Sequence, residues 1–310
     1  MPTCYICLDE GNELRHGGCA CRGDAGFFHI AFAVAAAQQS NETMWHTCPT
    51  CKEIYTGQAR LALVRQRVEF CSGEPELSLE RLGAQLDLTR ALVELGELDE
   101  ALESGSEALV AARRRLASSA GEPHSNTLDA LHTLALVHFH RAEYEAAEQL
   151  LTEGLEMARG VYGDESSSTQ QIVGFLGSVH LRNGNHSAAL PLMEESLQWN
   201  QRSRGNDDPE TIVKSCNLGT TYRHMGQFEL ALPLLRDAAQ RSRQVLGADH
   251  SNTLIAAAKL AAALGDAGEH AEAVPLLEHA IAGLVAKYGA QHSLVAEFQT
   301  ELLSCKLSMQ

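Results

Sequence analysis

The sequence predicts a mainly α-helical protein in which a small amino-terminal module precedes a long array of paired helices. Three observations indicate this architecture. Six of the nine cysteines fall in three close pairs within the first 51 residues. Alanine and leucine dominate after residue 75, a composition typical of helices, and aromatic residues make up only 5% of the chain. Glycines then recur every 42 residues, as expected when one helical unit is repeated.

The overall composition excludes several classes of protein. A net charge of −16 argues against a protein that binds the nucleic-acid backbone, which requires concentrated lysine and arginine. A secretory signal begins with a basic segment that is followed by an apolar one. The residues from Met1-Pro2-Thr3 onward do not have this pattern, so no secretory signal is expected. The longest apolar run, Ile30 to Ala37, is far shorter than the roughly 20 residues of a membrane-spanning helix. Clustered thiols suit a reducing compartment, so we expect a cytoplasmic protein, with the nucleus as the alternative.

The amino-terminal segment has the ligand pattern of a metal-binding module. The candidate ligands, in chain order, are Cys4, Cys7, Cys19, Cys21, His29, Cys48 and Cys51. Cys-x-x-Cys and Cys-x-Cys spacings let two thiolates reach one tetrahedral ion, and zinc is the usual occupant of such sites. A module of about 60 residues buries little apolar surface, so bound zinc would supply most of its folding energy.

With these spacings, residues 1–60 resemble the RING-CH (RING-variant) zinc module of ubiquitin ligases. The resemblance implies two zinc ions held in a cross-brace, with the first and third ligand pairs on one ion and the second and fourth on the other. One implied site is complete and consists of Cys19, Cys21, Cys48 and Cys51. The other site takes Cys4, Cys7 and His29, but its fourth position is Phe32, which cannot bind a metal.

Phe32 leaves the second implied site open to different interpretations. Water or a nearby histidine, His16 or His46, completes it, or else this zinc is weak or absent and Phe32 packs in its place. The PHD finger is the alternative family, because it shares the ligand order and often has a tryptophan at the place of Trp45.

The RING-CH resemblance also implies a docking surface for a ubiquitin-conjugating enzyme. In such ligases the zinc is structural and the chemistry belongs to the bound enzyme, so no catalytic residue is expected in this chain. The implied docking residues are Ile6, Trp45, Pro49 and Lys52. Lys52 stands where a cation holds enzyme and ubiquitin together, which lysine does less well than the planar, five-donor arginine.

Residues 76–290 are expected to form five units of paired amphipathic helices, the first of which starts near Leu79. The marker glycines are Gly121, Gly163, Gly205, Gly247 and Gly289. A Ser/Asn/Thr cluster after these glycines supplies N-cap oxygens for a first helix, and an Asn-Gly-type turn separates it from a second. Three prolines, Pro191, Pro233 and Pro275, recur inside the second helices and are expected in the first turn or at a shared kink.

Segments on either side of the array complete the predicted organisation. Residues 61–75 are a linker with a helix or short strand, and residues 291–310 form one capping helix. The cysteines outside the ligand pattern, Cys71, Cys216 and Cys305, are expected to be buried thiols.

The Gly-x-x-His-Ser-Asn-Thr segments that start at Gly121 and Gly247 resemble the tetratricopeptide repeat, in the 42-residue form found in kinesin light chains. The resemblance implies an α-solenoid whose first helices line a groove for a protein or peptide partner. The expected groove residues are Asp129, His132, His140, Gln171, Ser178, Arg182, Thr220 and His224. His140, Arg182 and His224 form a weakly basic line that favours an acidic peptide, and a solvated ridge without a ligand is the alternative.

These expectations lead to hypotheses from different functional classes. In the first, the chain is a RING-type ubiquitin-protein ligase or ligase adaptor, whose zinc module docks the conjugating enzyme and whose groove binds the substrate. In the second, it is a non-catalytic scaffold for protein–protein interactions with a structural zinc module. A PHD-like peptide reader is a third hypothesis. Whether the chain acts as a ubiquitin transferase is left open, and no covalent intermediate on this chain is expected.

Overall fold

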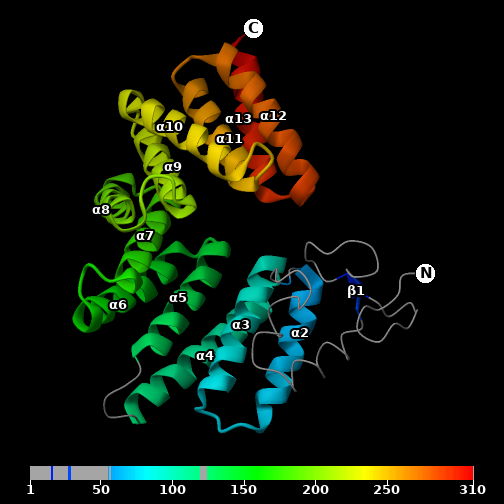
Figure 1. Cartoon of the computed structure of the whole chain (residues 1–310), viewed down its shortest axis with the longest axis vertical. Helices are drawn as coiled ribbons and strands as arrows, with labels where there is room; N and C mark the ends of the chain where they lie inside the picture. The colour runs from blue at the N-terminus through cyan, green and yellow to red at the C-terminus, as the bar shows by residue number, and fades with distance from the viewer. Residues whose placement is uncertain (1–14, 17–26, 29–54, 56, 119–123, 310) are drawn as a thin grey trace. The chain divides into compact units, whose positions relative to one another are not determined.

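The computed structural model describes residues 15–16, 27–28, 55, 57–118 and 124–309 (Figure 1). Two short strands, β1 (Arg15–His16) and β2 (Phe27–Phe28), pair antiparallel with Arg15 opposite Phe28. Within these ranges the remaining regular elements are helices. The chain divides into two compact units, Met1–Val161 and Tyr162–Gln310, and each is described on its own.

Within its described residues, the first unit contains one leading helix and two helix pairs. Its helices are α2 (Gly57–Phe70), the 3-10 turn η3 (Cys71–Gly73), α3 (Leu79–Leu95), α4 (Leu98–Ser118), α5 (His124–His140) and α6 (Tyr144–Tyr162). Leu61 and Val64 of α2 are fully buried and share one apolar core with Leu92 of α3 and Leu131 of α5. The segment expected as a linker is therefore largely helical and is part of this core.

The second unit contains three helix pairs and one further helix. These are α7 (Ser167–Arg182), α8 (His186–Arg204), α9 (Pro209–His224), α10 (Phe228–Leu246), α11 (Ser251–Asp266), α12 (His270–Tyr288) and α13 (Ser293–Ser308). Leu254, Leu264, Leu277 and Phe298 lie in its main core. The expectation of a mainly α-helical array of helix pairs is confirmed.

In α7, α9 and α11 the helix is capped by the residue just before the position of the expected Ser/Asn/Thr cluster. Ser166 accepts a hydrogen bond from the backbone N–H of Thr169 at 3.1 Å and thereby caps α7. Asp208 caps α9, and the ring Nδ1 of His250 caps α11. In these three helices the capping residue is the last one with extended backbone.

Small residues set the distance between the two helices of a pair. A Cβ atom added to Gly219 of α9 would lie 2.6 Å from Cγ of Leu235 on α10, so only glycine fits at this spacing. A Cβ atom added to Gly177 of α7 would lie 3.0 Å from Cγ of Met193 on α8. The small residues at these positions therefore allow the two helices of a pair to pack closely.

The recurring prolines lie deeper in the second helices than the first turn. Pro191, Pro233 and Pro275 are the sixth residues of α8, α10 and α12. A proline there removes one helical hydrogen bond and leaves the carbonyl four residues earlier without its partner. All three prolines are exposed, so water can solvate that carbonyl.

The structure also bears on the free cysteines and on membrane-spanning helices. Cys71, Cys216 and Cys305 are free thiols and are buried, as expected. Of the helices in the described residues, none is both long enough and apolar enough to cross a membrane.

Candidate functional site

The residues expected to line a groove share one face of the first helix in each pair. In α5 this face carries Asp129, Thr133, Leu136 and His140, whose spacings of four, three and four residues place them on one side of the helix. The 42-residue repeat continues it as Gln171, Phe175, Ser178 and Arg182 in α7; Val213, Asn217, Thr220 and His224 in α9; Ile255, Lys259, Ala262 and Asp266 in α11; and Glu297 and Glu301 in α13. We call these positions the first-helix face.

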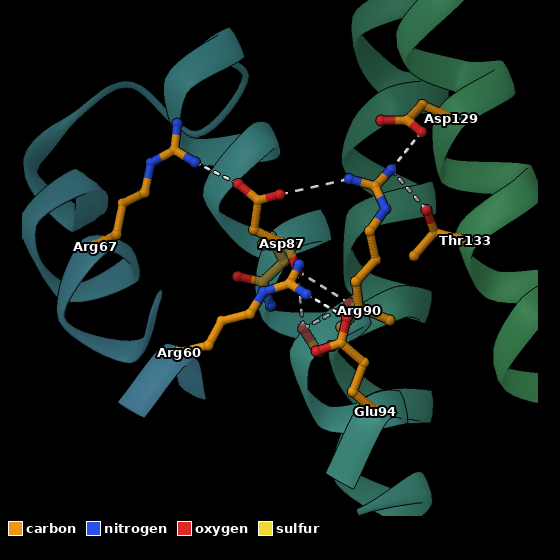
Figure 2. Close-up of polar contacts among 10 residues, drawn as sticks. Arg60, Arg67, Asp87, Arg90, Glu94, Asp129 and Thr133 are labelled. Carbon is orange, nitrogen blue, oxygen red and sulfur yellow. Dashed lines mark hydrogen bonds and ion pairs between the residues drawn. The ribbon is translucent and has the colours of Figure 1, made fainter. Parts of the chain in front are cut away.

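In the first unit this face holds a ladder of ion pairs, which Figure 2 shows. Asp87 of α3 pairs with Arg67 of α2, and its other oxygen lies 3.5 Å from Nη1 of Arg90. Arg90 pairs in turn with Asp129 of α5 and donates to Oγ1 of Thr133 at 3.0 Å. The chain Arg67–Asp87–Arg90–Asp129 thus links three helices and balances two cations with two carboxylates.

Helix α2 supplies a second cation to α3. Arg60 pairs with Glu94, two turns along α3 from the Arg67–Asp87 pair (Figure 2). Since the earlier residue of α2 meets the later residue of α3, the two helices run antiparallel. Arg67 is 7% exposed, so this end of the ladder is largely shielded from water.

In the second unit α13 provides the carboxylates for the first-helix face. Glu297 Oε2 lies 3.3 Å from Nη1 of Arg182 on α7. Glu301 Oε1 lies 2.6 Å from Nη2 of Arg223 on α9, and the same guanidinium donates through Nε to Asp266 of α11 at 2.6 Å. The basic character expected from Arg182 is therefore offset by α13.

Lys259 differs from Arg182 and Arg223 because its hydrogen-bond partner is an amide oxygen rather than a carboxylate. Its ammonium donates to Oδ1 of Asn217 on the neighbouring first helix at 2.7 Å. Burial lowers the pKa of Lys259, and the nearby Arg182 lowers it further, while Cys216 and Glu297 oppose the shift. Lys259 and Asn217 occupy the same position in successive repeats, so their contact runs across the face from one first helix to the next.

The remaining predicted groove residues make more local contacts. Ser178 donates to the carbonyl of Gly174 at 2.9 Å, and Thr220 donates to that of Cys216 at 2.8 Å, so both hydroxyls are satisfied within their own helices. His132 is half-buried on α5, and Gln171 is exposed on α7.

Two predicted histidines make aromatic contacts. The ring of His140, at the end of α5, meets Phe139 edge-on, with centroids 5.7 Å apart. His224 stacks on His186, the first residue of α8, with ring centroids 5.0 Å apart and an interplanar angle of 4°. Burial lowers the pKa of His224, and Arg223 and His186 add to this shift, so the ring is neutral near pH 7. His224 therefore adds no cation to the face at that pH.

The expected zinc ligands and enzyme-docking residues lie outside the described residues. This holds for Cys4, Cys7, Cys19, Cys21, His29, Cys48 and Cys51, and for Ile6, Trp45, Pro49 and Lys52. Phe32 lies outside them as well. Over 57–118 and 124–309, the structure contains no cluster of three or more His, Cys, Asp or Glu side chains that could hold a metal ion.

Several residues that make polar contacts on the first-helix face were not predicted from the sequence. Asn217, Lys259, Glu297 and Glu301 were not predicted, although each lies exactly in the register of Asp129 or Thr133. Stepping the position of Thr133 forward by the repeat length would have found three of them. The ladder arginines of α2 had no such signal, because α2 lies outside the 42-residue period.

Comparison with known proteins identifies the repeats. Family models described as tetratricopeptide repeat match residues 127–168 and 213–284. Among curated proteins, no match was found. The matched segments cover most of the pairs α5–α6, α9–α10 and α11–α12, so these helix pairs are similar to tetratricopeptide repeats.

Solved structures support the same fold. The nearly identical TPR-like repeats of a putative kinesin light chain from Podosopora anserina are 22% identical to this chain, with a TM-score of 0.55 over 69% of this chain and 99% of that one. BtubC (BKLC) from P. vanneervenii is 16% identical, with a TM-score of 0.59 over 75% and 92%. A Rap protein complexed with competence and sporulation factor is 13% identical, with a TM-score of 0.58 over 89% and 85%. At these identities the likeness establishes the fold, an α-solenoid with kinesin-light-chain-like neighbours.

Proposed function

We propose that the helix-pair array is a scaffold that binds an acidic segment of a partner protein along the first-helix face of the second unit. The observation that carries the proposal is Lys259. Its side chain is half-buried, and its ammonium donates to one neutral oxygen, that of Asn217. An ammonium has three donors, so donors remain for a carboxylate of the partner.

The electrostatics favour an anion at this point. Burial without a charged partner costs free energy, which is why the pKa of Lys259 is lowered. A partner carboxylate would restore the favourable charge interaction. Arg182 and Arg223 already hold Glu297 and Glu301 on the same face, so carboxylates are the groups that this surface accommodates.

The test is a peptide-display selection against the full chain, followed by affinity measurements on the selected peptides. We expect Asp- and Glu-containing peptides, and about tenfold weaker binding to Lys259→Met, since hydrogen bonds to charged groups are worth about 1.5–3 kcal/mol. Lys287→Met, which removes an exposed lysine of α12, is the matched control and should bind normally. Selected peptides without acidic residues, or equal affinity for both variants, would overturn the proposal.

For the amino-terminal segment we propose zinc binding and the docking of a ubiquitin-conjugating enzyme, which would make the chain a ligase or ligase adaptor in the cytoplasm. The support is the ligand spacing from Cys4 to Cys51. Cys19, Cys21, Cys48 and Cys51 would hold one ion, and Cys4, Cys7 and His29 would hold a weaker one. The array would then select the substrate of the bound enzyme.

Two measurements test this second proposal. Metal analysis of the purified chain should find zinc, and Phe32→Cys should raise the zinc content or its retention against a chelator. The zinc-loaded chain should accelerate ubiquitin discharge from a panel of conjugating enzymes, and Ile6→Ala or Lys52→Ala should slow this discharge. A folded, zinc-loaded chain that accelerates none of them is a scaffold alone.

A further inference from the structure

Helices α7, α8 and α9 meet at a group of polar side chains. A Cβ atom added to Gly174 of α7 would overlap Nζ of Lys214 on α9 and would lie 2.6 Å from Oγ of Ser196 on α8. Gln170 lies one turn before Gly174 on α7, and Asn200 lies one turn after Ser196 on α8. We call Gln170, Ser196, Asn200 and Lys214 the polar junction.

The polar junction interrupts a pattern of small and apolar residues that the neighbouring repeats keep. Gln170 and Lys214 occupy positions that are apolar and buried in those repeats, and Ser196 occupies a position of glycine or alanine. The equivalent residues are Leu128, Ile212 and Leu254 for Gln170; Ala130, Ile172 and Ala256 for Lys214; and Gly154, Ala238 and Ala280 for Ser196. Apolar packing is therefore weakened where α7 and α8 meet α9.

Three members of the polar junction are buried with polar atoms that lack a partner. Gln170, Ser196 and Asn200 are 4%, 0% and 2% exposed. Within the described residues, Oε1 of Gln170, Oγ of Ser196 and Oδ1 of Asn200 make no hydrogen bond. Such an atom costs free energy when helices close around it, and it gains hydrogen bonds to water when they separate. The junction thus favours separation more than an apolar contact would.

The main core of the second unit does not extend across the polar junction. Its buried members lie in α9–α13, between Ile212 and Cys305, and the described residues of α7 and α8 contribute none to it. A smaller cluster of Met193, Leu197 and Leu218 joins α8 to α9. The α7–α8 pair is therefore packed on α9 through a core of its own.

An ion pair connects the end of α7 to α13. Nη1 of Arg182 lies 3.3 Å from Oε2 of Glu297, and the two side chains are 52% and 49% exposed. Ion pairs that are this exposed contribute little to stability. The contact can therefore break and form again when α7 moves.

From these observations we infer that the α7–α8 pair is a hinged element, which opens from α9–α13 as one body at the polar junction. Opening exposes the junction atoms to water and breaks the pair of Arg182 with Glu297. It also moves Arg182 relative to Lys259 of α11, so it changes the spacing of cations along the first-helix face. The array is thus able to adjust this face without unfolding α9–α13.

The test is native-state hydrogen exchange of the full chain, measured by mass spectrometry without a partner. We expect the amides of α7 and α8 to exchange together, and at least about tenfold faster than those of α11 and α12. Gln170→Leu, Ser196→Ala and Lys214→Ala, combined in one variant, introduce residues of the neighbouring repeats. This variant should slow exchange in α7 and α8 by about tenfold and leave α12 unchanged.

Two further variants complete the experiment. Gln170→Leu alone should slow exchange in α7 and α8 by a smaller factor, so the test does not depend on the folding of the combined variant. Gln198→Ala, at an exposed position of α8, is the matched control and should exchange as the wild type does.

Two results would overturn the inference. Exchange in α7 and α8 that is as slow as in α11 and α12 would show that all four helices open together. Wild-type exchange rates in Gln170→Leu and in the combined variant, with the helical circular dichroism of both unchanged, would show that the polar junction does not control the opening.

Discussion

Ala142 has a backbone conformation that glycine supplies in the later repeats. It lies between α5 and α6 with φ 59°, and its equivalents Gly184, Gly226 and Gly268 have φ of 75°, 71° and 85°. This left-handed conformation costs an alanine roughly 1–2 kcal/mol, whereas glycine adopts it freely. The turn after α5 is thus strained, and the sequence alone did not indicate it.

We predict that Ala142→Gly stabilises the protein. The relief of strain is partly offset by the greater freedom of glycine in the unfolded chain, about 0.4–1 kcal/mol, so the free energy of unfolding should rise by about 0.5–1 kcal/mol. Urea unfolding measures this change. Ala282→Gly, at an exposed position within α12, should lower the free energy of unfolding by about 1 kcal/mol. A loss of stability in both variants would show that Ala142 is not strained.

Lys214 occupies a position that is apolar in the neighbouring repeats. Its equivalents Ala130, Ile172 and Ala256 are buried in the packing of their helices. Burial lowers the pKa of Lys214, and Glu210, whose Oε1 lies 4.0 Å from Nζ, compensates for this only in part. The charged ammonium therefore destabilises the folded state.

We predict that Lys214→Met raises the free energy of unfolding at pH 7 by about 1 kcal/mol. The pKa of Lys214 in the folded state lies below its ordinary value of 10.5. At pH values between the folded pKa and 10.5, Lys214 therefore binds more protons in the unfolded state than in the folded state. The stability of the wild-type chain should then increase with pH across this window, relative to the variant. Urea titrations of the wild-type chain and the variant from neutral to alkaline pH give the difference. A difference that stays constant with pH would contradict a lowered pKa for Lys214.

At the scale of elements, α2 is attached to the array by charge as well as by apolar contacts. Arg67 and Asp87 have side chains that are 8% and 19% exposed, so removal of the carboxylate breaks an ion pair that is largely shielded from water. Asp87→Ala should lower the free energy of unfolding by about 3 kcal/mol. Hydrogen exchange should show that the amides of α2 lose protection first.

Two variants control the Asp87 prediction. Glu76→Ala breaks a pair with Arg114 whose side chains are 65% and 62% exposed, and it should cost less than about 1 kcal/mol. Arg67→Met combined with Asp87→Leu removes both charges and should recover most of the lost stability. Equal losses for Asp87→Ala and Glu76→Ala would show that the ladder contributes nothing beyond a surface ion pair.

The elements differ in how far their sequence predicts them. The helix pairs follow from the 42-residue period, because each pair buries the same apolar positions against its neighbours. Helix α2 does not follow from the period: it appears once, and its arginines Arg60 and Arg67 are oriented by ion pairs with α3. The capping positions of Ser166 and Asp208 were missed because capping depends on which residue keeps extended backbone.

At the scale of the whole molecule, the sequence predicts the position of the first-helix face better than the chemistry of that face. The period places Arg182 and His224 on the first-helix face, as the structure does. The charge around them depends on contacts between residues far apart in the chain, such as the 3.3 Å pair of Arg182 with Glu297. Such pairs leave no periodic signal, so the balance of charge on the face had to come from the structure.

The two parts of the molecule should respond differently to loss of metal. In the part of the chain that the structure describes, the two main cores of the array consist of apolar side chains between Leu61 and Cys305. A chelator should therefore release zinc while the helical circular dichroism and the main thermal transition remain unchanged. Cys19→Ser should reproduce the chelated state. Cys305→Ser, which places a hydroxyl in the core of the second unit, should instead lower the transition temperature without changing the zinc content. A chelator that abolishes the helical signal would mean that the array depends on the metal for its folding.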